Sequence, residues 1–264
     1  MGQAGLLAGK RALILGVAND HSIAWGIAKA FAAHGAELAF TYQGEGFGRR
    51  VVPLAESLGA EIIQPADVQD EDSLDALFAR IGSEWGRLDV LVHAIAYSDK
   101  AELDGRFLDT SRANFTRSLE ISCYSLVDLT RRATPLMTNG GSVLTLTYIG
   151  AQRVTPHYNV MGVAKAALES AVRYLANDLG PEGIRVNAIS PGPMRTLAGA
   201  AIAGARKVYH ATERNAPLRA NATLEAVGGT AVYLASDLGA CTSGEVIFVD
   251  GGFHVLGMAQ PENL

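Results

Sequence analysis

Cysteine is scarce in this chain, which has only Cys123 and Cys241 among its 264 residues. Neither residue has a histidine or a second cysteine at the spacing of a metal site. Two cysteines far apart in the sequence exclude a small disulfide-stabilised scaffold. We expect two buried free thiols, as in a protein of a reducing compartment, and no bound metal.

Long hydrophobic runs are also missing. The longest stretch without a charged residue, 133–152, contains Pro135, Asn139, Gly140 and Gly141, so it cannot cross a bilayer as one apolar helix. The N-terminal residues lack the basic segment and the apolar run of a secretory signal peptide. We therefore expect a cytoplasmic protein with no membrane partner.

An excess of positive charge is absent as well. The chain carries 22 Lys and Arg against 27 Asp and Glu, a formal net charge of −5. This balance provides no long-range attraction for a phosphate backbone, so nucleic acid is not an expected partner. The hydrophobic share of 48% and the charged share of 19% are typical of a globular chain. No low-complexity segment or linker interrupts it, and we expect one domain over residues 1–264.

Short apolar runs alternate along the chain with helical patterns. Most runs are continuous, as in strands of a parallel sheet covered on both faces, whereas residues 74–85 repeat apolar side chains at helical spacing. Glycines just past the last turn, among them Gly86 and Gly180, are expected to end several helices. The alternation predicts a single doubly wound (Rossmann-type) parallel α/β sheet of about seven strands with helices on both faces. The predicted strands are 12–15, 38–41, 61–63, 88–92, 142–147, 186–189 and 246–249.

The turn after the first predicted strand has the features of a nucleotide-binding loop. Gly16 permits a sharp strand exit, and a helix is predicted to begin near Ser22 or Ile23. Amide groups and the positive dipole at such a helix start attract a pyrophosphate. The match to the G-x-G-x-x-G pattern is incomplete, because Ala18 replaces the second glycine. An ordinary glycine-containing turn is therefore the alternative.

Other strand ends supply further candidates. Gln43 follows the second strand, at the place where an acidic residue usually binds the ribose of NAD. Asp67 and Val68 follow the third strand, where a carboxylate can accept a hydrogen bond from an adenine amino group. His93 ends the fourth strand, and we interpret it as a structural histidine rather than a catalytic one.

Tyr158 and Lys165 form the most informative pair in the sequence. They are seven residues apart in a predicted helix, a rotation of about 700° that puts both side chains nearly on one face. A phenol and an ammonium can share one cleft at this spacing. From these two residues alone, a packed tyrosine and a surface lysine are an equal alternative.

This stretch resembles the short-chain dehydrogenase/reductase superfamily, and within it the NADH-dependent enoyl-acyl-carrier-protein reductases of bacterial fatty acid synthesis. The superfamily arrangement is Tyr-x-x-x-Lys with a serine upstream. Here Met161 stands at that tyrosine position and Tyr148 at the serine position, which gives the Tyr-x9-Tyr-x6-Lys pattern of the enoyl reductases. The likeness covers essentially the whole chain, and its further motifs lie at 16–24, 40–43, 158–162, 180–183, 185–190, 192–198 and 249–253.

The resemblance implies an NADH site built from successive strand ends, with Lys165 on the nicotinamide ribose. The residues implied for the pyrophosphate are Gly16, Ser22 and Ile23; those for the adenosine end are Gln43, Asp67 and Val68, with Ile95 beside the ribose; those closing over the carboxamide and phosphates are Met194, Arg195, Thr196, Leu197 and Ala198.

The resemblance also implies the substrate-binding residues. Tyr158 would face the thioester carbonyl, Tyr148 would line the acyl site, and Ser98 would contact the substrate. Reduction of a trans-2-enoyl thioester requires a donor that stabilises an enolate oxygen. A carbonyl reductase instead requires a phenol that delivers a proton to an alkoxide, and Met161 cannot do this. C=C reduction is therefore favoured over C=O reduction, with Tyr148, Tyr158 and Lys165 as the catalytic residues.

Residues 196–210 are rich in alanine, are interrupted by glycine and directly follow the predicted nicotinamide segment. We expect them to form a mobile helical lid that covers the substrate, and a core helix is the alternative. Arg206 and Lys207 are candidates for contact with an acidic carrier protein, and a solvated charge pair explains them equally well.

Other functions are open at this point. A carbonyl or alcohol oxidoreductase of the same superfamily would use similar residues, and a non-catalytic NAD(H)-binding sensor would bind cofactor without turnover. NADH is favoured over NADPH by the resemblance and by the lack of a basic pocket at Gln43. The resemblance further implies enoyl-acyl carrier protein as the substrate partner and a homotetramer with 107–135 and 158–179 at the interface.

Overall fold

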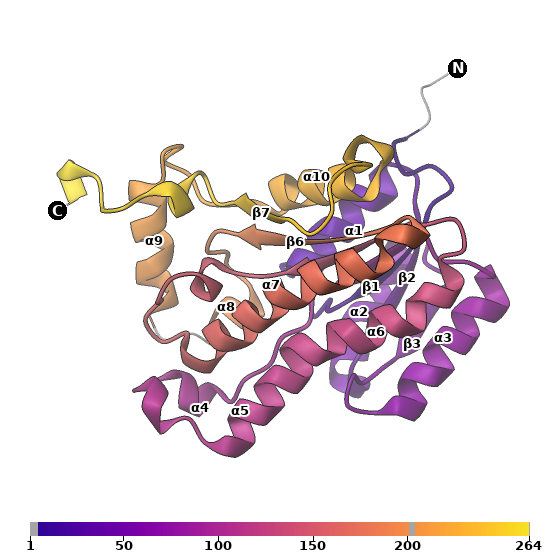
Figure 1. The fold of residues 1–264 in the computed structure, drawn as a ribbon, viewed down its shortest axis with the longest axis horizontal. Coiled ribbons are helices and arrows are strands. Elements are labelled where there is room, and N and C mark those ends of the chain that lie inside the picture. The colour runs from indigo at the N-terminus through magenta and orange to yellow at the C-terminus, as the bar shows by residue number, and fades with distance from the viewer. Residues whose placement is uncertain (1–4, 201–203, 264) are drawn as a thin grey trace.

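The structure, a computed structural model, describes residues 5–200 and 204–263 and is shown in Figure 1. Within that part of the chain the strands form one seven-stranded sheet of order β3-β2-β1-β4-β5-β6-β7. All neighbouring strands are parallel. The strands are β1 Arg11–Leu15, β2 Glu37–Tyr42, β3 Ile62–Pro65, β4 Val90–His93, β5 Gly141–Leu146, β6 Ile184–Pro191 and β7 Val246–Val249.

The sheet confirms the predicted doubly wound α/β fold. Each predicted strand is present with small shifts at its ends, so that Leu88 lies before β4 and Thr147 follows β5. Side chains of a strand alternate between the two faces of a sheet. In β1, Ile14 packs into the core on one face while Leu13 packs into the core on the other. Burial on both faces explains why the predicted strands are continuous apolar runs.

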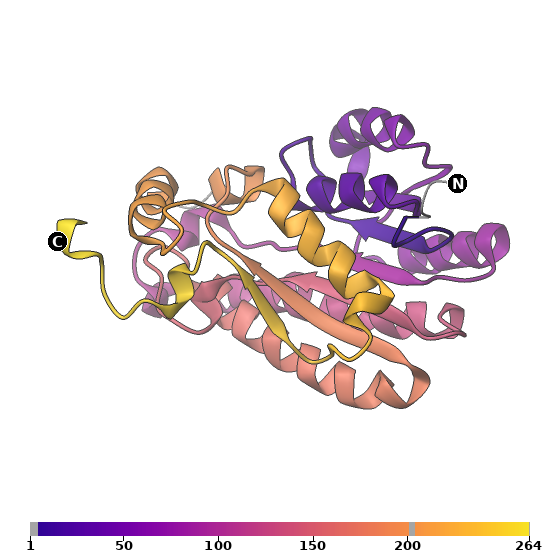
Figure 2. The ribbon, with the colours of Figure 1, turned by 90° about the horizontal axis from the view of Figure 1, so that it is seen from above.

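Helices cover both faces of the sheet, as Figure 2 shows from above. One face is covered by α1 (Ile23–Ala33), α2 (Gly44–Ser57) and α10 (Leu224–Ala235), and the other by α3 (Glu71–Trp85), α6 (Ser125–Ala133) and α7 (Asn159–Leu179). The remaining α-helices lie beyond the carboxyl ends of the strands in Figure 1: α4 Lys100–Leu103, α5 Arg112–Leu119, α8 Leu197–Ala200 and α9 Ala205–Asn215.

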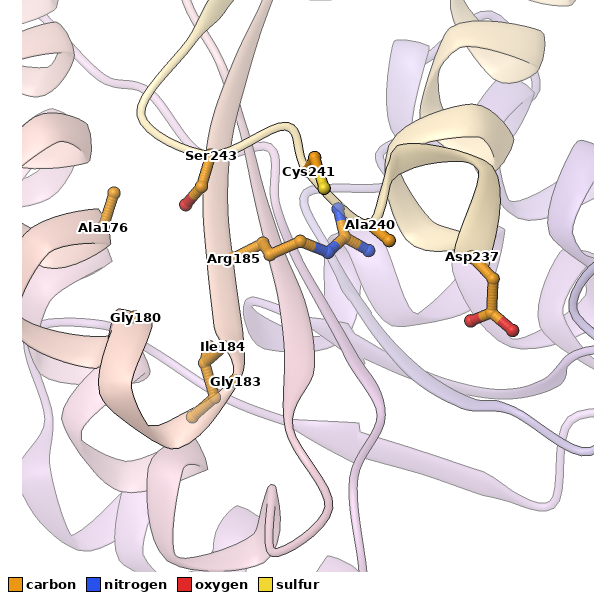
Figure 3. A pocket seen from close by; sticks show the side chains of 9 residues that line it. All are labelled: Ala176, Gly180, Gly183, Ile184, Arg185, Asp237, Ala240, Cys241 and Ser243. Carbon is orange, nitrogen blue, oxygen red and sulfur yellow. The ribbon is translucent and has the colours of Figure 1, made fainter.

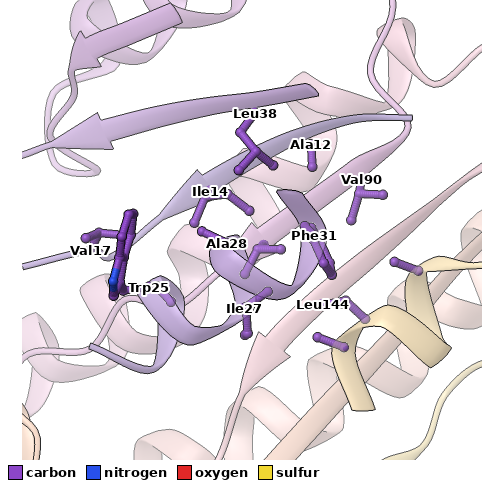
Figure 4. Packing of buried hydrophobic residues seen from close by; sticks show 14 of the residues in the cluster. Ala12, Ile14, Val17, Trp25, Ile27, Ala28, Phe31, Leu38, Val90 and Leu144 are labelled. Carbon is purple, nitrogen blue, oxygen red and sulfur yellow. The ribbon is translucent and has the colours of Figure 1, made fainter. Parts of the chain in front are cut away.

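Two predicted helix faces are buried as expected. Ile27 and Phe31 of α1 are fully buried against the sheet near Ile14 (Figure 4). Complete burial of each such side chain contributes about 1.5–3 kcal/mol. The predicted face of 74–85 is the buried face of α3, with only Trp85 at its margin partly exposed.

The predicted end of α7 is confirmed, because the helix ends at Leu179 and Gly180 follows its last turn. Gly180 keeps a right-handed φ of −53°, and the chain continues into a short 3₁₀ turn, Gly180–Glu182. The reversal into β6 occurs at Gly183, whose φ is 74°. Pro181 suits the 3₁₀ turn, because its ring fixes its own φ in a right-handed range.

The free thiols differ from the expectation. Cys123 is half-buried, but Cys241 is exposed, so the prediction of two buried thiols is wrong for Cys241. Cys241 lies in the surface turn between α10 and β7.

Among the helices described, none is both long and apolar enough to cross a membrane. The described residues contain no cluster of three or more His, Cys, Asp or Glu that could hold a metal ion.

Candidate active site

The strand order places a candidate ligand site at the carboxyl ends of the strands, which we call the carboxyl edge of the sheet. The order reverses between β1 and β4, which are hydrogen-bonded neighbours although two strands separate them in the sequence. Ligands of open α/β sheets bind beyond the carboxyl ends of the strands at such a reversal. The segments that follow β1, β2, β3, β4, β5 and β6 all lie at this edge, and they contain every predicted cofactor residue.

The turn after β1 is built to bring backbone close to a ligand. Gly16 has a φ of 100°, and a Cβ there would collide with the carbonyl oxygen of Ala94. The hydroxyl oxygen of buried Ser22 accepts hydrogen bonds from the amides of Ala18 (3.0 Å) and Asn19 (3.1 Å). Ser22 is the N-cap of α1, and Ile23 is its first residue. The geometry suits a pyrophosphate, because the first amides of a helix have no partner within it.

Gly16→Ala is expected to destabilise the protein by about 2 kcal/mol or more, because the added methyl group meets Ala94 in a backbone conformation that favours glycine. Urea unfolding measures this change. Gly46→Ala in α2 is the matched control, since a Cβ there meets no atom within 4 Å, and we expect a neutral or slightly stabilising effect. Equal stability of the Gly16→Ala variant and the parent would contradict this account of the turn.

The predicted adenosine-binding residues lie together. The side-chain amide of Gln43 donates to a carboxylate oxygen of Asp67 at 2.8 Å, which fixes both side chains. The other oxygen of Asp67 accepts from the amide of Gln69 at 3.0 Å. Val68 is partly buried in the core beneath them. Arg49 and Arg50 are exposed on α2, as expected for residues that face solvent.

His93 is a structural residue, as predicted. Its ring is fully buried, with Nδ1 at 2.8 Å from the hydroxyl of Thr145 and Nε2 at 2.8 Å from the hydroxyl of Ser125. Burial, assisted by the positive charge of Lys165, lowers the pKa of His93 to about 3. The neutral imidazole connects two hydroxyl groups, on β5 and α6, and adds no positive charge to the candidate site.

The loop after β4 contains Ile95 and Ser98 and is held by residues that sequence reasoning missed. The amide of Tyr97 donates to the hydroxyl of buried Ser122 at 3.0 Å, and that hydroxyl donates to the carbonyl of Tyr97 at 3.1 Å. Ser98 shares a hydrogen bond with the carboxamide of Asn114 on α5. Ser122 belongs to a π-helical turn, Glu120–Tyr124, which no sequence signal reveals.

Tyr158 is buried at the start of α7. The prediction that it lies within the helix is wrong by one residue, because Tyr158 is the N-cap and α7 begins at Asn159. Its neighbours His157 and Asn159 have positive φ values of 62° and 40°. The carboxamide of Asn159 donates to the carbonyl of Leu103 at 3.2 Å and helps to hold this unusual backbone.

The Tyr158 hydroxyl is kept in its protonated form. Burial raises its pKa well above the usual value, and electrostatic interactions with Tyr148 and Glu169 act in the same direction. The Tyr148 ring lies edge-on to it, with ring centroids 5.1 Å apart and an interplanar angle of 64°. Burial also raises the pKa of Tyr148, with a further contribution from Asp250. The structure therefore pairs two neutral phenols, one of them in an apolar cluster with Leu103, Val160 and Met161.

Lys165 is a buried ammonium. Its Nζ donates to the carbonyl of Leu146 at the end of β5, at 2.8 Å, and only 5% of the residue is exposed. Burial lowers its pKa to about 8, while electrostatic interactions with Cys123 and Glu169 oppose that shift. At neutral pH the group is positively charged and retains two further N–H donors, since an ammonium has three.

The segment after β6 contains the predicted nicotinamide-covering residues. Partly buried Met194 packs against the core beside α1, and its carbonyl accepts from the amide of Thr196 at 3.0 Å. The guanidinium of Arg195 lies 4.7 Å from the centre of the Tyr209 ring in α9. Leu197 and Ala198 begin α8, and the side chain of Leu197 is exposed.

The expected lid over 196–210 is described in part. Its ends are α8 and the first turns of α9, and residues 201–203 lie outside the described residues. Arg206 and Lys207 are both exposed on α9.

A surface hollow of about 400 Å³ lies at the opposite edge of the sheet, near the amino ends of β6 and β7 (Figure 3). Arg185 in its wall donates to the carbonyls of Leu234 and Ser236, so its guanidinium is engaged by α10. None of the predicted cofactor or substrate residues lines this hollow. The chemistry-bearing side chains lie at the carboxyl edge.

Comparison with known proteins gives matches over nearly the whole chain. The family model described as enoyl-(acyl carrier protein) reductase matches residues 16–254. One enoyl-acyl-carrier-protein reductase (NADH) of Rhizobium meliloti is 56% identical over 260 residues, which are 98% of this chain and 97% of that protein.

Solved structures agree with this match. An enoyl-acyl-carrier-protein reductase from Anaplasma phagocytophilum, crystallised with NAD, has a TM-score of 0.94 at 55% identity, covering 98% of this chain and 97% of that chain. A Bacillus cereus enoyl-acyl carrier protein reductase, crystallised with NADP+ and indole naphthyridinone, has a TM-score of 0.94 at 48% identity, covering 96% of this chain and 100% of that chain.

Proposed function

The chain belongs to the enoyl-(acyl carrier protein) reductase family, and we propose that Tyr158 and Lys165 perform its reduction of trans-2-enoyl thioesters with NADH. The observation that supports these roles most is the contact between the rings of buried Tyr158 and partly buried Tyr148, with Met161 at the superfamily tyrosine position. The reaction is the last step of each fatty acid elongation cycle, with the acyl chain carried on acyl carrier protein.

The chemistry requires a stabilised oxyanion. NADH supplies a hydride, which adds to the β-carbon of the enoyl thioester and leaves negative charge on the thioester oxygen. Tyr158 donates its hydroxyl proton in a hydrogen bond to that oxygen, and its raised pKa keeps the phenol protonated for this purpose. The α-carbon then takes a proton from solvent, which completes the saturated thioester.

Lys165 has a different role in this proposal. Its Nζ is held by Leu146, and its two remaining donors are available to the nicotinamide ribose. Its positive charge also lowers the energy of the nearby enolate. Tyr148 lines the acyl site beside Tyr158, and Ser98 contacts the substrate from the loop after β4.

The cofactor-binding residues fit an NADH molecule. Gly16, Ser22 and Ile23 hold the pyrophosphate, because the turn has no Cβ at Gly16 and α1 starts there. Gln43, Asp67 and Val68 hold the adenosine end, and Ile95 lies beside the ribose. The segment from Met194 to Ala198 closes over the carboxamide and the phosphates.

Asp67→Ala is expected to raise the KM for NADH about tenfold and to leave kcat unchanged at saturating NADH. The substitution removes a charged acceptor for adenine and releases Gln43, and a hydrogen bond to a charged group contributes about 1.5–3 kcal/mol. Initial rates at varied NADH measure both constants. Asp72→Ala, an exposed change on α3, is the control. An unchanged KM would remove Asp67 from the cofactor site.

Turnover of defined substrates tests the proposed function. Loss of reduced-nicotinamide absorbance is followed with a trans-2-enoyl thioester, with NADH and NADPH in parallel, and with a β-ketoacyl thioester as the control. We expect turnover of the enoyl substrate with NADH and none of the ketoacyl substrate. Ketoacyl turnover would contradict the assignment of Met161 and Tyr158.

We further propose that the active form is a cytoplasmic homotetramer of single-domain subunits, with the segment 196–210 as a lid over the acyl chain. Large apolar side chains are exposed on the segments 107–135 and 158–179, and their burial between subunits supports this assembly: Phe107, Leu108, Phe115, Tyr124 and Tyr174. Arg206 and Lys207 on α9 are available to an acidic carrier protein.

A further inference from the structure

Glu169 is a buried carboxylate in the catalytic helix. It follows Lys165 by one turn of α7, and only 5% of the residue is exposed. A buried carboxylate is costly unless its oxygens accept hydrogen bonds. Here one oxygen accepts from the hydroxyl of Thr147 at 2.8 Å and the other from the side-chain amide of Gln152 at 3.0 Å. Both partners are neutral, so the site retains the negative charge of Glu169.

These two partners lie at the two ends of the segment that contains Tyr148. Thr147 directly precedes Tyr148, and its amide continues the sheet by donating to the carbonyl of Ile189 at 2.9 Å. Gln152 closes the 3₁₀ turn Ile149–Ala151, and its amide donates to the carbonyl of Ile149 at 3.0 Å. The carboxylate of Glu169 thus fastens both ends of residues 147–152 to α7.

The fastened segment packs directly on Tyr158. A Cβ at Gly150 would collide with the ring of Tyr158, and a Cβ at Gly162 would lie 2.8 Å from the carbonyl oxygen of Gly150. The turn therefore lies directly against the ring of Tyr158 and against α7 at Gly162. Its position on α7 determines how the Tyr148 and Tyr158 rings meet, at 5.1 Å between centroids.

The charge of Glu169 acts on the same two reactive groups. It raises the pKa of Lys165, against the effect of burial, and it adds to the raised pKa of Tyr158. Other titratable groups also face these side chains: Cys123 faces Lys165 from the π-helical turn and raises its pKa, neutral His93 faces it from β4, and Asp250 after β7 faces Tyr148. Glu169 is the carboxylate that affects both Lys165 and Tyr158.

We propose that Glu169 is a positioning residue of this reductase, which fixes the Tyr148 turn against Tyr158 and places a buried carboxylate one helical turn from buried Lys165 on the same side of α7. The inference rests on the proposed function of Tyr158 and Lys165. Glu169 acts on the Tyr148 turn through hydrogen bonds and on Lys165 through charge. Different substitutions can therefore test the two effects separately.

Glu169→Gln tests the charge. The amide has nearly the same shape, still accepts from Thr147, and can donate to Gln152 once the Gln152 amide reverses. NADH affinity is measured by fluorescence titration from pH 6 to pH 10, a readout that needs no turnover. As the pH rises, we expect NADH affinity to begin to fall about one pH unit lower in the variant than in the parent. Between these two pH values the variant should bind NADH about tenfold more weakly. Superimposable titrations of variant and parent would overturn the effect of charge.

Thr147→Val tests the hydrogen bonds, since it removes one fastening point and leaves the charge in place. We expect kcat on the enoyl thioester to fall severalfold at every pH, with the pH dependence of NADH affinity unchanged. An unchanged kcat would overturn the positioning role, and this variant still tests it if Glu169→Gln does not fold. Exposed Glu225→Gln on α10 is the control for both measurements. Absence of enoyl turnover in the parent would contradict the proposed function instead.

Discussion

Tyr158→Phe lowers kcat on a trans-2-enoyl thioester by about 10²–10³-fold, equivalent to about 2.7–4 kcal/mol, because the enolate loses its main hydrogen-bond donor. The size of the effect follows from the surroundings of the phenol. Tyr158 is buried in an apolar cluster, where no bulk water replaces the missing donor. The phenyl ring keeps the packing against Tyr148, so we expect NADH affinity and the melting temperature to stay near those of the parent.

The controls separate this role from general damage. Tyr233→Phe removes a tyrosine hydroxyl from α10, where its partner is Thr242 and no predicted site residue, and its kcat should equal that of the parent. Tyr148→Phe should have a smaller effect than Tyr158→Phe, because Tyr148 lines the acyl site. Parental turnover in the Tyr158→Phe variant would contradict the role of Tyr158 as the hydrogen-bond donor to the enolate.

Lys165→Met weakens NADH binding by about 10–100-fold, since a hydrogen bond from a charged group contributes about 1.5–3 kcal/mol. The same change should leave the cofactor-free protein at least as stable as the parent at pH 7, because replacement of a buried charge by an apolar side chain is often neutral or stabilising. Calorimetric titration and thermal unfolding measure the two effects. Lys29→Met, an exposed change on α1, is the control for both.

The pH dependence of stability gives an independent check on Lys165. Its pKa is about 8 in the folded protein and 10.5 in an exposed lysine, so between these values the unfolded state binds more protons. Stability therefore rises with pH in this window as the cost of the buried charge disappears. The difference in melting temperature between Lys165→Met and the parent should narrow from pH 7 to pH 10. A constant difference would contradict a buried ammonium.

The fold could be predicted from the sequence because its central strands are buried on both faces. Burial on both faces requires continuous apolar runs such as 12–15, and these runs give the seven strands in order. The helix beginning at Ile23 was also predictable, since Ser22 is a preferred N-cap residue. The end of α7 at Gly180 was predictable as well, whereas the 3₁₀ turn through Pro181 that precedes the reversal at Gly183 was not.

The site was predictable where spacing or a strand end carries the chemistry. Gln43 and Asp67 follow different strands, and the parallel sheet brings them within hydrogen-bond distance. The supporting residues escaped prediction for a physical reason. Asn114, Ser122 and Glu169 act through contacts between segments distant in sequence, and Ser122 depends on a π-helical turn that has no sequence period. Glu169 was hidden because a glutamate in a helix is ordinarily exposed.

The central claim is that hydride reaches the β-carbon of an enoyl thioester while Tyr158 stabilises the enolate. The most direct measurement uses NADH in which both hydrogens at nicotinamide C4 are deuterium, with a trans-2-enoyl thioester, followed by mass spectrometry and NMR of the product. The account predicts a saturated thioester with one deuterium at the β-carbon and a solvent-derived hydrogen at the α-carbon. Deuterium at the α-carbon, or a product that contains none, would contradict it.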